Sequence, residues 1–134
     1  CYRKDLFQAK KLEAPKIWDD YLKVAKALND PHNMYGCIVP SAETGASTLL
    51  LETMFMKNDV HWFEWNAGKK EYEVALDKGN QRKRAIETLD YLNELHKFSP
   101  EASTYNWGEL MSTYFTEKAA TDCKKSRGRW PAVS

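Results

Sequence analysis

Helical periodicity bounded by proline constrains the fold of this chain more than any other feature of its sequence. Between Pro15 and Pro31, apolar side chains recur at every third or fourth position. This spacing places them on one face of an α-helix, and the two prolines mark its limits. The side chains on that face are Trp18, Tyr21, Leu22, Ala25 and Leu28. We therefore expect an amphipathic helix that buries this face, with Trp18 in the core.

Two later segments show the same period. A second helix is predicted from about residue 81 to residue 98, before Pro100, with one apolar face made by Ala85, Leu89, Leu92 and Leu95. A third is predicted to follow Asn106, because Asn106 and Glu109 have the spacing of a capping box. Its apolar face consists of Trp107, Leu110, Met111, Tyr114 and Phe115.

The segments between these helices give weaker signals. Residues 35–39 are apolar and partly β-branched and end at Pro40, which predicts a short buried strand. Residues 46–57 are apolar on more than one side, which is typical of an inner helix. Residues 58–80 are irregular, with a strand or hairpin expected around residues 72–76.

Length and charge limit the classes of function. The chain has 134 residues, enough for one core, and its formal net charge is +1. This balance removes the usual electrostatic argument for binding nucleic acid or an anionic membrane, and the basic stretches 81–84 and 124–129 favour solvated faces. We find no apolar run that could span a bilayer and expect no membrane insertion. The 13% aromatic content suits a protein that binds neutral ligands with spare rings.

Catalytic and metal-binding signals are weak. The three histidines and three cysteines lie far apart in sequence and form no metal-ligand spacing: His32, His61, His96, Cys1, Cys37 and Cys123. No nucleophile or phosphate-binding motif occurs, and no pair of carboxylates stands out as an acid and base. We therefore expect no cofactor, no metal and no catalytic residue, with a carbohydrate-active enzyme as a minor alternative.

Six short motifs occur in an order that carries more information than any one of them. They lie at residues 2–7 (YRKDLF), 15–20 (PKIWDD), 25–28 (AKAL), 35–36 (YG), 106–109 (NWGE) and 118–120 (KAA). In this order they resemble the middle of the extracellular solute-binding proteins of ABC sugar importers, the maltose-binding-protein-like family 1. The resemblance implies an α/β fold, namely the helix-rich C-terminal lobe of a two-lobed periplasmic-binding-protein-like fold, with short strands and flanking helices. Residues 1–134 would form a single lobe of a larger protein.

The resemblance also implies a function. Such receptors bind a saccharide between two lobes without chemistry and dock on ABC permease subunits, so this chain would need a missing N-terminal lobe. A periplasmic or extracellular, surface-associated location follows from the resemblance, since the first residues show no signal-peptide core. The alternative is a truncated lobe that serves as a structural or interaction fragment and associates with another chain.

Candidate ligand-binding residues are aromatic side chains and loop polar groups. Trp130, in the sequence Gly128-Arg129-Trp130, resembles the family tryptophan that stacks on sugar, with a surface position near the chain end as the alternative. The remaining candidates are Tyr105, Trp107, Trp62, Glu43 and Thr44. For Trp107, packing in the core is as well supported as ligand binding, and for Trp62 packing is favoured. For Glu43 and Thr44, a position in a solvated loop is as well supported as ligand binding. Glu43 and Thr44 follow the predicted strand, where ligands of α/β sheets gather.

Four residues, at three sites, depart from the family pattern with a physical consequence. Ile17 replaces a capping Thr, which costs about 1 kcal/mol of helix stability. Asn58 and Asp59 replace a Gly-Gly turn, although they adopt left-handed geometry less readily than glycine. Thr121 replaces an apolar Met, which puts the packing of the last segment in question.

Overall fold

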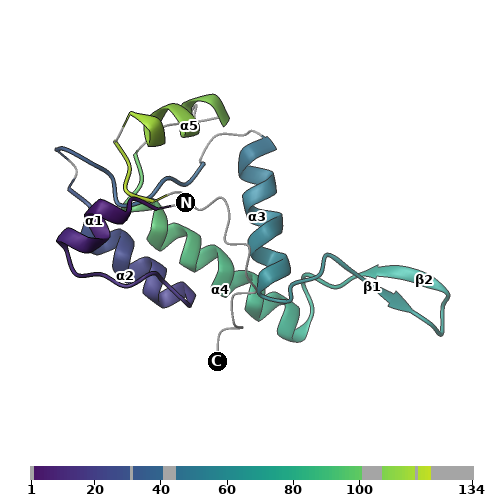
Figure 1. Ribbon diagram of the computed structural model, residues 1–134. Helices are drawn as coiled ribbons and strands as arrows, with labels where there is room; N and C mark the ends of the chain where they lie inside the picture. Colours follow the sequence, from purple (N-terminus) through teal and green to yellow (C-terminus); the bar gives the residue numbers. More distant parts are fainter. Residues whose placement is uncertain (1, 31, 41–44, 101–106, 117, 122–134) are drawn as a thin grey trace.

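The computed structural model describes residues 2–30, 32–40, 45–100, 107–116 and 118–121 (Figure 1). In chain order its elements are α1 (Lys4–Ala9), α2 (Trp18–Leu28), α3 (Gly45–Lys57), β1 (Phe63–Asn66), β2 (Glu71–Val74), α4 (Gly79–His96) and α5 (Trp107–Phe115). The three amphipathic helices and the hairpin predicted from the sequence are confirmed as α2, α4, α5 and β1–β2. The short α1 was not predicted.

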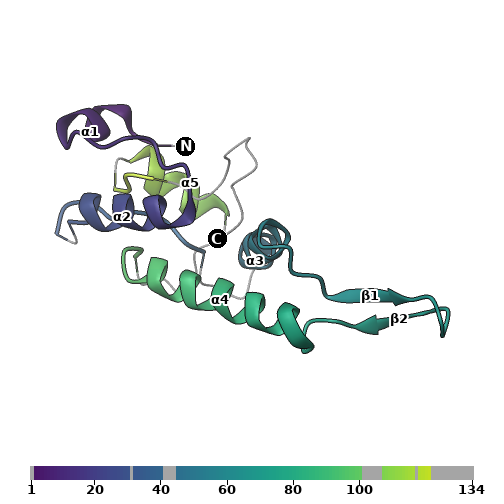
Figure 2. The ribbon, with the colours of Figure 1, turned by 90° about the horizontal axis from the view of Figure 1, so that it is seen from below.

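The core lies where α4 packs against both α2 and α3 (Figure 2). Ala25 of α2 and Leu95 of α4 are fully buried, and Cys37 and Val39 complete this central cluster together with Tyr21. A neighbouring cluster joins one side chain from each of the three helices: Trp18, Met54 and Leu92. Trp18 is 8% exposed, so its predicted place in the core is confirmed.

Ile17 leaves the start of α2 without a side-chain cap, as expected from its sequence. The carboxylate of Asp20, in the first helical turn, accepts a bond of 3.3 Å from the backbone N–H of Lys16. This acidic residue also interacts favourably with the positive end of the helix dipole. The missing cap is therefore partly compensated one turn into the helix.

Residues 35–39 are buried but do not form the strand predicted for them. Among the described residues, Tyr35 makes one isolated parallel bridge to Ala119, and the only ladder joins β1 to β2. The backbone of this segment instead bonds several different neighbours. The N–H of Cys37 donates to the carbonyl of Phe98, and the N–H of Val39 donates to Oγ of Ser99. Satisfied backbone groups, rather than a sheet, allow this segment to be buried.

Three expectations about helix faces are also wrong. On α5, Met111 and Phe115 are exposed, and Thr113 is buried in addition to Leu110. Leu89 of α4 is 44% exposed, and Thr88 takes the buried position beside it. Thr88 tolerates burial because its hydroxyl donates to the carbonyl of Arg84 and accepts from Nδ2 of Asn58. Helix α3 is not enclosed by the described residues, since Leu49 and Met56 are half or more exposed.

Thr121 packs without an unpaired polar group. It is 1% exposed, and its hydroxyl donates to the carbonyl of Gly36 at 2.7 Å. The hydroxyl of Tyr21 lies 3.1 Å from Oγ1 of Thr121 and forms a hydrogen bond with it. The buried hydroxyl of Thr121 is therefore fully paired, whereas residues 122–134 of the last segment lie outside the described residues.

Gly36 is required by a close approach of its backbone to α2. A Cβ built at this position would lie 1.9 Å from the carbonyl oxygen of Ala25, which is backbone and has little freedom to move. Gly36→Ala should therefore lower the free energy of unfolding by about 3 kcal/mol, measured by urea unfolding followed by circular dichroism. Gly45→Ala is the control, because a Cβ there meets nothing within 4 Å. Equal unfolding midpoints for the two variants would contradict the assignment.

Candidate functional site

Most of the ligand-binding residues predicted from the sequence lie outside the described part of the chain. This holds for Glu43, Thr44, Tyr105 and Trp130. Trp107 is the first residue of α5, and only its backbone is described. Trp62 is therefore the predicted ligand-binding residue whose side chain has a described position.

The turn that positions Trp62 begins at the end of α3. Asp59 has φ +56, the left-handed conformation that the replaced glycine would adopt readily. Its carboxylate accepts hydrogen bonds from Nη1 of Arg84 and from Nε2 of His61, the latter at 3.1 Å. First the Arg84 bond and then the His61 bond lower the pKa of Asp59. An ionised side chain thus clamps the turn to α4 and offsets the unfavourable backbone conformation.

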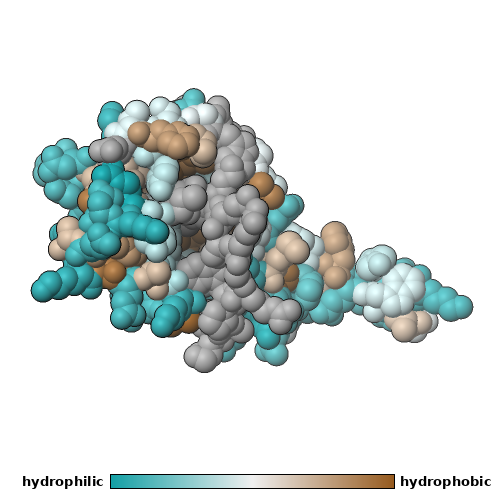
Figure 3. Space-filling model, viewed as in Figure 1, coloured by the Kyte–Doolittle hydropathy of each residue, from teal (hydrophilic) through white to brown (hydrophobic). Residues whose placement is uncertain are grey.

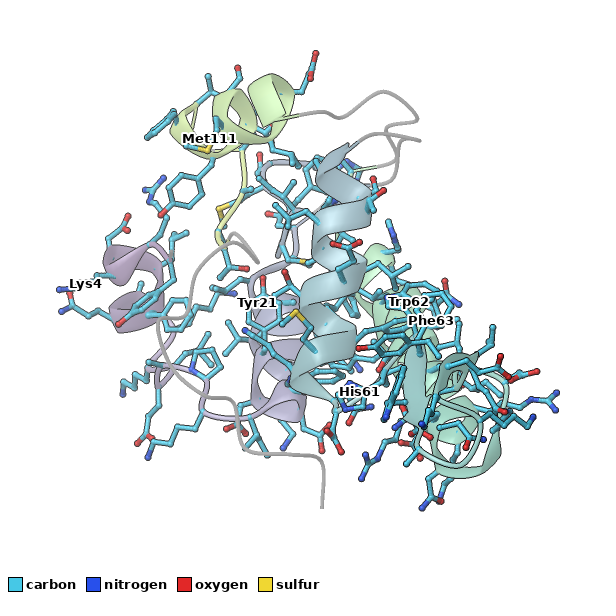
Figure 4. All side chains as sticks on the ribbon, turned by 90° about the vertical axis from the view of Figure 1, so that its right-hand side faces the viewer. Lys4, Tyr21, His61, Trp62, Phe63 and Met111 are labelled. Carbon is cyan, nitrogen blue, oxygen red and sulfur yellow. The ribbon has the colours of Figure 1, made fainter. Side chains whose placement is uncertain are left out.

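Trp62 follows this clamp and lies against the end of α3. Its ring centroid is 5.2 Å from that of Phe55, and its carbonyl accepts the N–H of Ala75 at 2.9 Å. The side chain keeps 42% of its surface exposed. Figure 4 shows Trp62 and Phe63 close together beside α3 and α4. One part of the Trp62 ring is therefore used for packing, and the rest is accessible to a ligand.

Beyond Trp62, β1 and β2 form a two-stranded ribbon that projects from the helices (Figure 1). The antiparallel register pairs Phe63 with Val74 and Trp65 with Tyr72. Because residues two apart in a strand share a face, these four side chains lie on one face of the ribbon. All are exposed, at 61%, 52%, 55% and 72% respectively. We call this set the apolar ribbon face.

The opposite face of the ribbon is charged. It carries Glu64, Asn66, Glu71 and Glu73. Oε1 of Glu73 accepts from Nζ of Lys69 at 2.7 Å and from Nδ2 of Asn66 at 3.0 Å, and Oε2 accepts from Nζ of Lys78 at 3.0 Å. These bonds, the Lys69 bond first, lower the pKa of Glu73 to about 2.

A hollow of about 280 Å³ adjoins the charged face. It is lined by Glu64, Trp65, Asn66, Ala67, Glu73, Val74 and Lys78. A sugar entering it would compete with Lys69, Lys78 and Asn66 for the carboxylate of Glu73, because both oxygens already accept bonds. The hollow is therefore less suited to hydroxyl groups than its lining residues alone indicate.

The sequence analysis missed the apolar ribbon face. The alternation of apolar and polar residues over 63–66 and 71–74 carries the signal, but it becomes informative only once the register is known. Within the described residues, no group of three or more His, Cys, Asp or Glu is placed to hold a metal ion. None of the helices in this described part combines the length and the apolar character that crossing a membrane requires.

Comparison with known proteins gives a consistent result. Residues 1–121 match the family model described as bacterial extracellular solute-binding protein. A relative from Escherichia coli (strain K12), YcjN, bears the name of an ABC transporter periplasmic-binding protein and is 38% identical over 95 residues. That match covers 70% of this chain and 20% of the relative.

Solved structures show the same fold. A sugar transporter from Arthrobacter chlorophenolicus A6 with bound laminaribiose superposes with a TM-score of 0.70 at 23% identity, over 90% of this chain and 29% of its own. Solute-binding proteins from Agrobacterium radiobacter K84, with ribitol, and Thermotoga lettingae TMO, with α-D-tagatose, give TM-scores of 0.65 and 0.69. Sequence identity to this chain is 24% for the first of these two proteins and 21% for the second. Each alignment covers 90% of this chain, which corresponds to 29% of the first protein and 31% of the second. The chain thus spans a fifth of the curated relative and less than a third of these structures, and the predicted fold class is confirmed.

The ion pairs of Glu73 predict how the ribbon responds to acid. A carboxyl whose pKa is lowered by folding stabilises the folded form fully above its ordinary pKa of 4.5, and this contribution disappears as the pH falls to about 2. The nuclear Overhauser contacts between Trp65 and Tyr72, whose rings lie 5.1 Å apart, should therefore weaken over this range. Glu73→Gln should remove that dependence, whereas Glu71→Gln on the same strand should keep it. Contacts that persist unchanged in the native chain down to pH 2 would contradict the role of Glu73.

Proposed function

The chain belongs to the bacterial extracellular solute-binding protein family, and we propose that it forms one wall of the saccharide-binding cleft in the receptor of an ABC sugar importer. The observation that carries this proposal is the family match over residues 1–121. The likeness in fold to proteins solved with laminaribiose, ribitol and α-D-tagatose supports a sugar or polyol as the ligand. More specifically, we propose that this ligand is an oligosaccharide.

The proposed mechanism is binding without chemistry. Residues 1–134 would form a single lobe, the C-terminal one, and a second lobe from the rest of the receptor would close over the sugar. Closure is a shift between two conformations, driven by the greater affinity of the closed form for the ligand. The closed form would then dock on ABC permease subunits at the periplasmic or extracellular side of the membrane.

Aromatic and polar side chains would divide the work of recognition. A sugar ring has an apolar C–H face that suits an aromatic ring and hydroxyl groups that need hydrogen-bond partners. Trp130 would stack on the sugar, with Tyr105 and Trp107 beside it, and Glu43 and Thr44 would bond hydroxyl groups. Trp62 would contribute the 42% of its surface that Phe55 leaves exposed.

The proposal predicts weak, localised sugar binding by the 134-residue chain. One wall of a cleft buries less of the ligand than two walls, so affinity should fall in the millimolar range. Titration with maltodextrin, laminaribiose, ribitol and tagatose, followed by nuclear magnetic resonance, should shift the indole signals of Trp62 and Trp130 and leave that of the buried Trp18 unchanged.

Matched variants separate the proposed ligand-binding residues from other aromatic residues. Trp130→Ala should abolish the shifts, while Trp65→Ala, outside the proposed site, should preserve them. No shift with any sugar would contradict the function. A sub-micromolar dissociation constant for any of these sugars, measured by calorimetry on the 134-residue chain, would contradict the proposal that the chain forms only one wall of the cleft.

The apolar ribbon face favours a second candidate function, the binding of another polypeptide. Soluble monomers seldom expose adjacent large apolar side chains, and such patches mark interaction sites. The chain should therefore bind the dye 8-anilinonaphthalene-1-sulfonate, and Trp65→Ser with Tyr72→Ser should reduce the fluorescence several-fold. A native chain that gives no dye fluorescence would contradict this candidate.

A further inference from the structure

We propose that the apolar ribbon face binds the same face of a second copy of this chain, giving a closed dimer with the two ribbons face to face and antiparallel. This inference rests on the second candidate function and names its site and its partner. It is independent of sugar binding, because none of the four residues of the apolar ribbon face is among the residues proposed to bind sugar.

The shape of the ribbon permits such a contact. In both orthogonal views the ribbon extends away from the helices, so its apolar face is not covered by α3 or α4 (Figures 1 and 2). Figure 3 shows brown and pale side chains along it, between the hydrophilic tip and the body of the molecule. Trp65 and Tyr72 contact each other edge to face, with ring centroids 5.1 Å apart, which holds the two largest rings in a defined arrangement. The apolar face is therefore accessible to a partner from the side of the ribbon.

The residues on the two faces of the ribbon determine which face can be buried in a dimer. Phe63, Trp65, Tyr72 and Val74 carry no charge, so two such faces meet without like-charge repulsion. The carboxylates of Glu64, Glu71 and Glu73 lie on the other face, where they stay in water. A patch that meets its own copy about a two-fold axis closes on itself and leaves no free face for a third copy.

The exposed area matches a weak dimer. With about 200 Å² for each aromatic side chain, the apolar ribbon face exposes on the order of 450 Å². Two copies would bury about 900 Å². This is slightly below the roughly 1,000 Å² of a specific interface and within the range of weak, transient contacts, so we expect dissociation in the high micromolar range rather than a permanent dimer.

Charges at the two ends of the ribbon favour the antiparallel arrangement. Lys70 lies in the turn at the tip, and Asp77 follows β2 at the base; both are exposed. An antiparallel pair places Lys70 of one copy near Asp77 of the other, whereas a parallel pair places like charges together. Charge complementarity therefore selects one of the two orientations.

Sedimentation equilibrium of the 134-residue chain, from low micromolar to near-millimolar concentration, tests the proposal. The native chain should show a reversible monomer–dimer equilibrium. Trp65→Ser with Tyr72→Ser should raise the dissociation constant at least about tenfold, since buried aromatic residues carry most of the affinity of an interface. Glu64→Gln with Glu71→Gln, on the same strands but the opposite face, is the matched control and should leave the constant unchanged. Circular dichroism should show the same helix content in all three proteins.

A second pair of variants tests the orientation. Lys70→Asp should weaken the dimer about threefold to tenfold, and adding Asp77→Lys should restore it. If neither change alters the dissociation constant, the antiparallel arrangement is wrong.

If the apolar ribbon face binds something other than a second copy, the measurements should differ from those expected for the dimer. A strictly monomeric chain whose Trp65 is still quenched by acrylamide at the highest concentration would overturn the second copy as partner and leave the dye-binding candidate function standing. Assembly that continues beyond two copies would overturn the closed pair. A dimer that dissociates on addition of laminaribiose, with sugar-induced shifts at Trp65, would overturn the assignment by making the face a sugar site.

Discussion

The fold depends on the close approach of residues 35–39 to helix α2, which the missing side chain of Gly36 permits. From this position the segment reaches partners that are distant in sequence: the side-chain oxygen of Asn29 bonds the N–H of Gly36, Thr121 bonds its carbonyl, and Phe98 bonds Cys37. These bonds hold the segment against the end of α2, the end of α4 and the residues that follow α5. The buried cluster around Ala25 and Leu95 is assembled by the same contact. Burial of this apolar run is therefore inseparable from the polar contacts that satisfy its backbone.

At two positions, Asp59 and Thr121, a local cost is offset by hydrogen bonds nearby. Asp59 adopts a conformation suited to glycine, and its carboxylate gains Arg84 and His61 as partners. Thr121 brings a hydroxyl into the core, and Tyr21 and Gly36 bond it. In both cases the side chain makes the hydrogen bonds that offset the cost at its own position. The fold is thus compatible with a polar side chain at these positions because each polar group finds a partner.

Sequence reasoning succeeded where one strong period dominated and failed where tertiary contacts decided. The face of α2 was largely predictable, because four of its five predicted residues are buried. Leu22 is only partly buried, and Val24, which was not predicted, is buried as well. The face of α4 was predictable at Ala85, Leu92 and Leu95 but not at Leu89. Thr88 is buried instead through hydrogen bonds to Asn58 and Arg84, which a hydropathy pattern does not record. The strand expected at residues 35–39 has the composition of a buried strand, yet its partners are single residues from several segments. The six-residue α1 is too short to show a helical period.

The aromatic residues of the hairpin region differ in the chemical groups that surround them, and these groups decide which kind of ligand each residue can bind. Stacking on a sugar requires hydrogen-bond partners for the hydroxyl groups beside the aromatic ring, whereas contact with another apolar surface requires their absence. On the apolar ribbon face the neighbours of Trp65 and Tyr72 are Phe63 and Val74, and the carboxylates of the ribbon point to its opposite side. A sugar bound to such a face would have hydroxyl groups without hydrogen-bond partners, and these groups would also lose their hydrogen bonds to water. The same surplus of aromatic residues can therefore serve two purposes in one chain, and the pleat of a four-residue strand is sufficient to separate them.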